Sequence, residues 1–239
     1  MSNEFSELFA VDVCLGNQIL KAFKGLSGGP KEFKEFLARP DAKKVMRHDT
    51  DSVQSFLKDY MADAKAVATV EGHRVNLPLL PVCWYCRKPG LAASDVHIDG
   101  AYNRWRTFWA EPEDAESAVA KVRMLSVALN YDIAFVARDK PALDKMLLAW
   151  FSFVSDTRSL HHRFKIPFHI SSGDGIDIDL PAEIRDPKTC AFQDATAGAS
   201  NFYAASATIE VHAAVLFGAA VSVVDPIRLS WALEPWHGA

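Results

Sequence analysis

The segment VCWYCRKPG contains the two residues whose type and spacing most directly suggest chemistry. Cys83 and Cys86 lie three positions apart, a spacing that redox dithiols and zinc half-sites share. A redox pair normally opens a helix, but the following residues 87–90 (RKPG) favour the end of an element. In a continuous strand, residues three apart point to opposite faces about 10 Å apart, which is too far for a disulfide. We expect a structural pair, and redox and metal roles stay open as alternatives.

A zinc site built on this pair would need about four ligands. The other cysteines, Cys14 and Cys190, are distant in the sequence and form no second paired spacing. His97 is the nearest further ligand, and it has no partner beside it. The sequence therefore predicts no metal and no cofactor.

Two other polar segments carry residue types found in active sites. Asp174, Asp177 and Asp179 in SGDGIDID lack the twelfth-position ligand of an EF-hand loop, and no helix follows GDG to bind phosphate. His161 and His162 are adjacent, so they point apart on any regular element. No nucleophile elbow, P-loop or dinucleotide motif is present, and we expect no enzyme activity.

Composition narrows the class of protein further. The chain has 239 residues, 49% of them hydrophobic, and a formal net charge of −4. A mildly acidic chain does not suggest a general binder of nucleic acid or acidic membranes. No apolar run reaches the roughly 18 residues of a membrane span, and the N-terminus lacks a secretory pattern. We expect a protein made in the cytoplasm that does not enter a membrane.

Helical periodicity is found in four segments. Apolar residues recur every three or four positions over residues 6–24, 30–40, 50–67 and 139–156. Gly25–Pro30 ends the first segment, and Asp139 beside Pro141 is the expected N-cap of the last. The aromatic residues on these stripes are expected to be core.

Strand patterns occupy most of the chain after Gly72. Residues 73–86 predict an edge or bent strand because Pro78 and Pro81 lack backbone donors. Residues 87–120 resemble a loop, and residues 123–138 and 201–219 predict long strands. Residues 164–184 predict a strand pair or one strand with a break at 173–175. In the 201–219 strand, Thr208, Glu210 and His212 face away from the apolar side.

This order of elements favours an α+β fold with a mainly antiparallel sheet packed with helices. We expect an N-terminal helical segment over residues 1–70, a core over residues 71–228 and an extended C-terminal arm over residues 229–239. Aromatic and arginine residues concentrate in the segments that resemble loops, and such residues are common in interfaces. The residues expected to contact another subunit or a partner are Trp84, Tyr85, Arg104, Trp105, Trp109, Trp231 and Trp236.

The order of motifs also carries a family resemblance. VNLPLLPVCWY is followed by a long gap, then by LSVALNYDIAFVARDKPALDKMLLAWFSFV, FKIPFHISSGDGIDI and FYAASATIEVHAAVLFGAAVSVVDP. Over residues 72–228 this resembles the tail-completion and sheath-stabiliser (tail terminator) proteins of contractile-tailed bacteriophages. The CWYC segment and the Trp-rich stretch at 101–110 depart from that pattern.

The resemblance implies a structural virion protein of the phage neck. It would form a ring, usually of six copies, that terminates the tail tube and contacts tube protein, sheath protein and the head–tail connector. A different neck protein, such as the connector itself, is the alternative, followed by a metal or redox protein and a peptide-binding adaptor. In a ring, strand faces would line the channel through which DNA passes without specific binding. The residues expected there are Asp177, Asp179, Thr208, Glu210 and His212.

Overall fold

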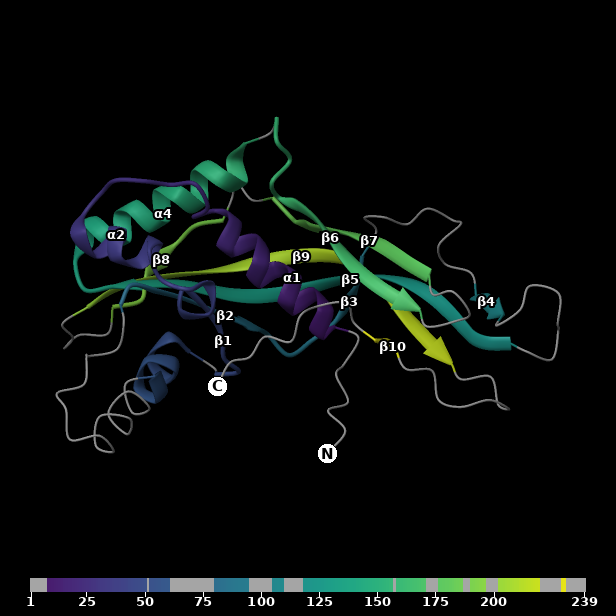
Figure 1. Cartoon of the computed structure of the whole chain (residues 1–239). Helices are drawn as coiled ribbons and strands as arrows, with labels where there is room; N and C mark the ends of the chain where they lie inside the picture. Colours follow the sequence, from purple (N-terminus) through teal and green to yellow (C-terminus); the bar gives the residue numbers. More distant parts are fainter. Residues whose placement is uncertain are drawn as a thin grey trace, which may run out of the picture.

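The computed structural model describes residues 8–50, 52–60, 80–94, 105–109, 118–156, 158–170, 176–186, 190–196, 202–219 and 229–230. The fold is α+β, with helices packed on a mainly antiparallel sheet (Figure 1). The central strands run in the order β1-β2-β5-β9-β7-β6-β10, and the β1–β2 pair is parallel. The strands are β1 (Val45–Arg47), β2 (Val82–Arg87), β3 (Ala92–Ala93), β4 (Trp105–Trp109), β5 (Ala118–Ala137), β6 (Arg163–Ile170), β7 (Ile176–Ile184), β8 (Gln193–Asp194), β9 (Tyr203–Ala219) and β10 (Leu229–Ser230).

Three helices follow the periodicity seen in the sequence. They are α1 (Phe9–Lys21), α2 (Lys31–Leu37) and α4 (Lys140–Ser155), and a short 3-10 helix, η1 (Asp41–Lys43), follows α2. The expected cap of α4 is confirmed, because the Asp139 carboxylate accepts a hydrogen bond from the backbone N–H of Ala142 at 2.9 Å. The Glu32 carboxylate joins α2 to this end by accepting from the backbone N–H groups of Arg138 and Asp139, at 2.8 and 3.0 Å.

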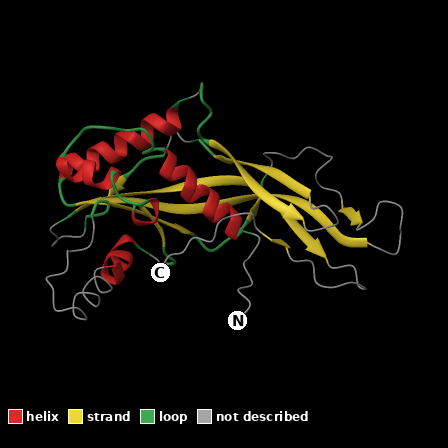
Figure 2. Cartoon of the chain, in the orientation of Figure 1, coloured by secondary structure: helices red, strands yellow, loops and turns green. Residues whose placement is uncertain are grey.

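One face of the sheet carries the main core, beneath α1, α2 and α4 (Figure 2). Alternate residues of β5 point toward these helices, including Leu129, Tyr131, Ile133 and Phe135, each fully buried. Burying an apolar side chain of this size contributes about 1.5–3 kcal/mol. The helices of the expected N-terminal segment therefore share one core with the sheet that follows them.

The opposite face is covered by a helical segment at one end. A helical segment at residues 53–60 packs there through Val53, Phe56 and Leu57. It contacts the other alternate residues of the sheet, including Trp84 on β2 and Ala134 on β5. Both faces of β2 are therefore covered at this end, and the rest of the opposite face has no helix over it in the described part of the chain (Figure 1).

Three expectations about the strands need correction. β2 lies between β1 and β5 and is not an edge strand, because the strand starts at Val82, after Pro81. Residues 87–120 contain β3 and β4, which pair with β5 in place of a continuous loop. β5 begins at Ala118, five residues before the apolar alternation becomes clear at Arg123. The strand pair at 164–184 and the long strand at 201–219 are confirmed as β6, β7 and β9.

Candidate functional site

The uncovered sheet face carries polar side chains from neighbouring strands, and we call it the polar face. Strand register places Asp132 of β5 beside Thr208 of β9, and His212 of β9 beside Glu183 of β7. Residues with the opposite alternation on the same strands are buried beneath the helices. The sequence prediction that Thr208 and Glu210 point away from the apolar side is confirmed, and both are exposed.

A charged cluster lies in the middle of the polar face. Lys88 Nζ lies 2.9 Å from an Asp132 carboxylate oxygen and donates to the Thr208 hydroxyl at 3.1 Å. The Thr208 hydroxyl in turn donates to Asp132 at 2.6 Å. Each charge on this part of the face therefore has an opposite partner, which reduces the attraction of mobile ions.

His212 is the exception among the expected channel residues, because it is buried, with 5% of its surface exposed. Its Nε2 lies 2.7 Å from Glu210 Oε1, and its Nδ1 lies 2.5 Å from Ser94 Oγ. A proton on Nε2 donates to the carboxylate and leaves Nδ1 to accept from the hydroxyl. In a serine protease triad, Nε2 bonds to the serine and Nδ1 to the carboxylate, so the two ring nitrogens have exchanged partners here. The serine of such a triad is also accessible, whereas Ser94 is 3% exposed. This arrangement fixes β3 to β9 and does not offer a nucleophile.

Two further ion pairs of the polar face join neighbouring strands. Arg163 Nε lies 3.3 Å from Glu183 Oε2, and Lys165 Nζ lies 2.8 Å from Asp179 Oδ2. Asp179 is about half exposed, as expected for this face. The backbone of Asp177 lies in β7, and its side chain is outside the described set. The described polar face is thus nearly balanced in charge.

Cys83 and Cys86 lie on opposite faces of β2, as a continuous strand requires. Cys83 pairs with Phe135 and is fully buried under α1, while Cys86 pairs with Asp132 on the polar face. Both are free thiols, and burial raises the pKa of each. Among the described residues, no three His, Cys, Asp or Glu side chains are grouped so as to hold a metal ion.

The expected interface residues need partial correction. Trp84 is 1% exposed and donates its indole N–H to the backbone carbonyl of His48 at 2.9 Å, and Tyr85 is 5% exposed. These two side chains are core and offer no surface to a partner. Trp105 and Trp109 lie in β4, but their side chains are outside the described set. Arg104, Trp231 and Trp236 also lie outside the described residues.

A buried charge cluster between α1 and the sheet was not expected from the sequence. Asp12 of α1 has no exposed surface and accepts from the Tyr131 hydroxyl at 2.6 Å and from Arg87 Nε at 3.1 Å. Arg47 Nη2 lies 3.1 Å from the other carboxylate oxygen, Oδ2. That contact is an ion pair without hydrogen-bond geometry, so Oδ2 accepts no hydrogen bond from the described residues.

Burial dominates the electrostatics of this cluster. Loss of solvent raises the pKa of Asp12, and the Tyr131 hydrogen bond and the two arginines offset this only in part. The Tyr85 hydroxyl closes the cluster by donating to the backbone carbonyl of Asp12 at 3.0 Å. The only sequence signal was one acidic residue inside the apolar stripe of α1. Its partners come from three distant segments, so spacing alone did not reveal them.

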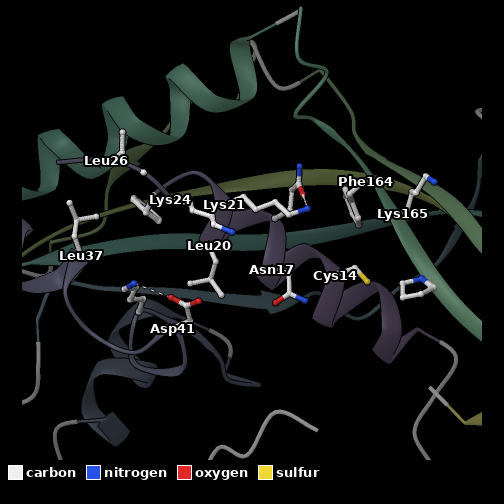
Figure 3. Close-up of a pocket in the computed structure, with 15 residues that line it drawn as sticks. Cys14, Asn17, Leu20, Lys21, Lys24, Leu26, Leu37, Asp41, Phe164 and Lys165 are labelled. Carbon is white, nitrogen blue, oxygen red and sulfur yellow. Dashed lines mark hydrogen bonds and ion pairs between the residues drawn. The ribbon is translucent and has the colours of Figure 1, made fainter. Parts of the chain in front are cut away.

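A groove of about 610 Å³ runs beside the C-terminal half of α1 (Figure 3). Figure 3 shows Leu37 and Asp41 at one end, Phe164 and Lys165 at the other, and α1 side chains between them. We call this the basic groove because its lining contains four lysines and one aspartate. The charged lining residues are Lys21, Lys24, Lys44, Lys165 and Asp41.

No family model matches the chain, and no curated protein matches its sequence. Within the described residues, no helix is both long enough and apolar enough to cross a membrane.

Proposed function

We propose that the chain is a structural subunit of the neck of a contractile-tailed bacteriophage, as the sequence resemblance implies. In this role, copies of the chain form a closed ring that terminates the tail tube and joins tube and sheath to the head. The observation that supports the proposal best is the two-sided sheet. Within the described residues, helices cover one face of the long strands β5 and β9, while the middle of the other face carries paired polar side chains and has a helical segment over it only at the end where residues 53–60 pack.

Such a face suits the wall of a channel that DNA crosses. Tight DNA binding requires lysine or arginine to neutralise phosphates and release counterions. On the polar face, Lys88, Arg163 and Lys165 are each paired with a carboxylate of the same face. A polymer of phosphates would therefore meet little unpaired positive charge and would pass without specific binding.

The test is the mass of the purified chain by light scattering across a concentration series, with negative-stain images of the same samples. A closed ring of about six copies with a central hole is the expected result. A particle of fixed mass without a hole, or a monomer at every concentration, would contradict the proposal.

A labelling experiment assigns the face within that ring. Cysteine replaces Glu210 on the polar face or, as the control, Lys31 on α2, whose side chain is 92% exposed. In the ring, a small maleimide should label both positions, while a long polymer maleimide should label only the control. Equal polymer labelling at both positions would show that the polar face does not line the channel.

A further inference from the structure

The basic groove differs in charge from the chain that contains it. The whole chain has a formal net charge of −4, yet four lysines and one aspartate line this groove. Asp41 is paired with Lys44 at 2.9 Å, and Lys165 is paired with Asp179. Lys21 and Lys24 are exposed and form no ion pair with a described residue. With respect to the described residues, these two lysines leave the groove with positive charge that no carboxylate offsets.

The floor of the groove is apolar. Cys14, Leu20, Phe23 and Phe164 line it, and Leu26 and Leu37 lie at the end opposite Phe164. Burial raises the pKa of the Cys14 thiol to about 11, although Lys21 acts in the opposite direction. A ligand that fits such a surface carries several negative charges together with small apolar groups.

One segment of the chain itself has this composition. Residues 110–117, AEPEDAES, join β4 to β5 and contain four carboxylates and no basic residue. β4 and the first residues of β5, with which it pairs, lie at the end of the sheet away from α2 and α4 (Figure 1).

The segment is too short to reach the groove of its own chain. Phe164 of the groove pairs with Ala182 of β7, Ala182 pairs with Ala213 of β9, and Ala213 pairs with Val127 of β5. Val127 lies nine residues from Ala118, where the segment joins β5, which corresponds to about 30 Å along the strand. A connection of eight residues that leaves the sheet and returns to it reaches at most about 15 Å from the ends of the two strands. If this segment occupies a basic groove, it must therefore be the groove of another copy.

We propose that the basic groove of one subunit binds the acidic segment 110–117 of the next subunit. The contact joins two different surfaces, so each copy both donates a segment and receives one, as a head-to-tail ring requires. Lys21 and Lys24 bind the carboxylates, and the floor of the groove contacts Pro112 and Ala115. Closure of these contacts into a ring rests on the proposed function, but the contact between groove and segment can be tested separately.

Charge reversal on each side of the contact tests it in the full-length chain. A groove variant, Lys21→Glu with Lys24→Glu, and a segment variant, Glu113→Lys with Asp114→Lys, should each self-associate at least tenfold more weakly than wild type. Mixing the two variants restores opposite charges at every contact, so the mixture should assemble again. The control is Lys31→Glu with Lys34→Glu on α2, outside the groove, which should assemble as wild type does.

Sedimentation velocity at low and high salt gives the mass of each sample, and circular dichroism checks the fold. If charge reversal disturbs folding, the neutral double variant Lys21→Gln with Lys24→Gln provides a second test, and it should also weaken self-association. Assembly of both variants as closed rings would overturn the groove contact and leave the proposed function standing. Open linear assemblies that dissociate on charge reversal would support the groove contact and contradict the closed ring. A wild-type monomer at every concentration, or failure of the mixture to assemble, would overturn the contact.

Discussion

Replacing Gly16 by alanine tests the packing of α1 against β2. A methyl group at Gly16 would lie 2.5 Å from the Tyr85 hydroxyl oxygen and 3.0 Å from its ring carbon Cζ. The first distance is shorter than side chains tolerate, so the Tyr85 ring must move. That movement breaks the hydrogen bond from the Tyr85 hydroxyl to the backbone carbonyl of Asp12.

The magnitude follows from opposing effects on the free energy of unfolding. Alanine is favoured over glycine within a helix by about 1 kcal/mol. Overpacking costs about 1–3 kcal/mol, and loss of the buried hydrogen bond costs about 1 kcal/mol more. Gly16→Ala should therefore destabilise the chain by about 1–3 kcal/mol, which lowers Tm by roughly 2–12 °C for a chain of this size.

A double-mutant cycle with Tyr85→Phe identifies the cause. Phenylalanine removes the closest atom, so Gly16→Ala should cost at least about 1 kcal/mol less in that background. Urea unfolding of the four proteins, followed by the fluorescence of the buried tryptophans, measures each difference. If Gly16→Ala stabilises the chain, or costs the same in both backgrounds, the packing described for Tyr85 is wrong.

Three further substitutions test the core and the buried charges by the same unfolding measurement. Cys83→Ser should cost about 1–3 kcal/mol because it buries a hydroxyl, and should cost more than Cys83→Ala, whereas a smaller loss for serine would argue for water at that site. Glu32→Gln should cost about 1–2 kcal/mol because an amide oxygen can replace only one of the two carboxylate acceptors. The control Glu35→Gln should be nearly silent, and equal losses would refute the role of Glu32. Burial raises the pKa of folded Asp12 above its unfolded value of 3.8, so the folded chain takes up that proton first. As the pH falls from 7 to 4.5, the free energy of unfolding of wild type should therefore rise relative to that of Asp12→Asn. A difference that stays constant or changes the other way would contradict this sign.

The local elements were predictable because their signals are local. The α4 helix has a complete apolar stripe and an N-cap at Asp139, and β9 alternates over its whole length, so periodicity identified both. The direction of Thr208 and Glu210 followed from that alternation. The continuous strand through Cys83 and Cys86 also placed the two thiols on opposite faces.

The errors concern tertiary contacts. Trp84 and Tyr85 were assigned to an interface because their residue types are common there, but β2 is covered on one face by α1 and on the other by residues 53–60. A strand with both faces covered shows no alternation that would reveal its position. Asp12 was missed because Arg47, Arg87 and Tyr131 meet it only after the sheet has formed. The partners of His212 depend in the same way on the pairing of β3 with β5.

The pairing of β5 with β9 also determines how the chain folds. Ala137 pairs with Tyr203 and Lys121 with Ala219, so the contacts join residues 66 to 98 positions apart. Closing such long intervals slows folding, because chain entropy is lost before the contacts form. During synthesis β5 and α4 leave the ribosome first and wait for the strand that covers the free edge of β5. A chain that stops before Tyr203 keeps this apolar edge open, so we expect premature termination to yield aggregates and not a smaller folded protein.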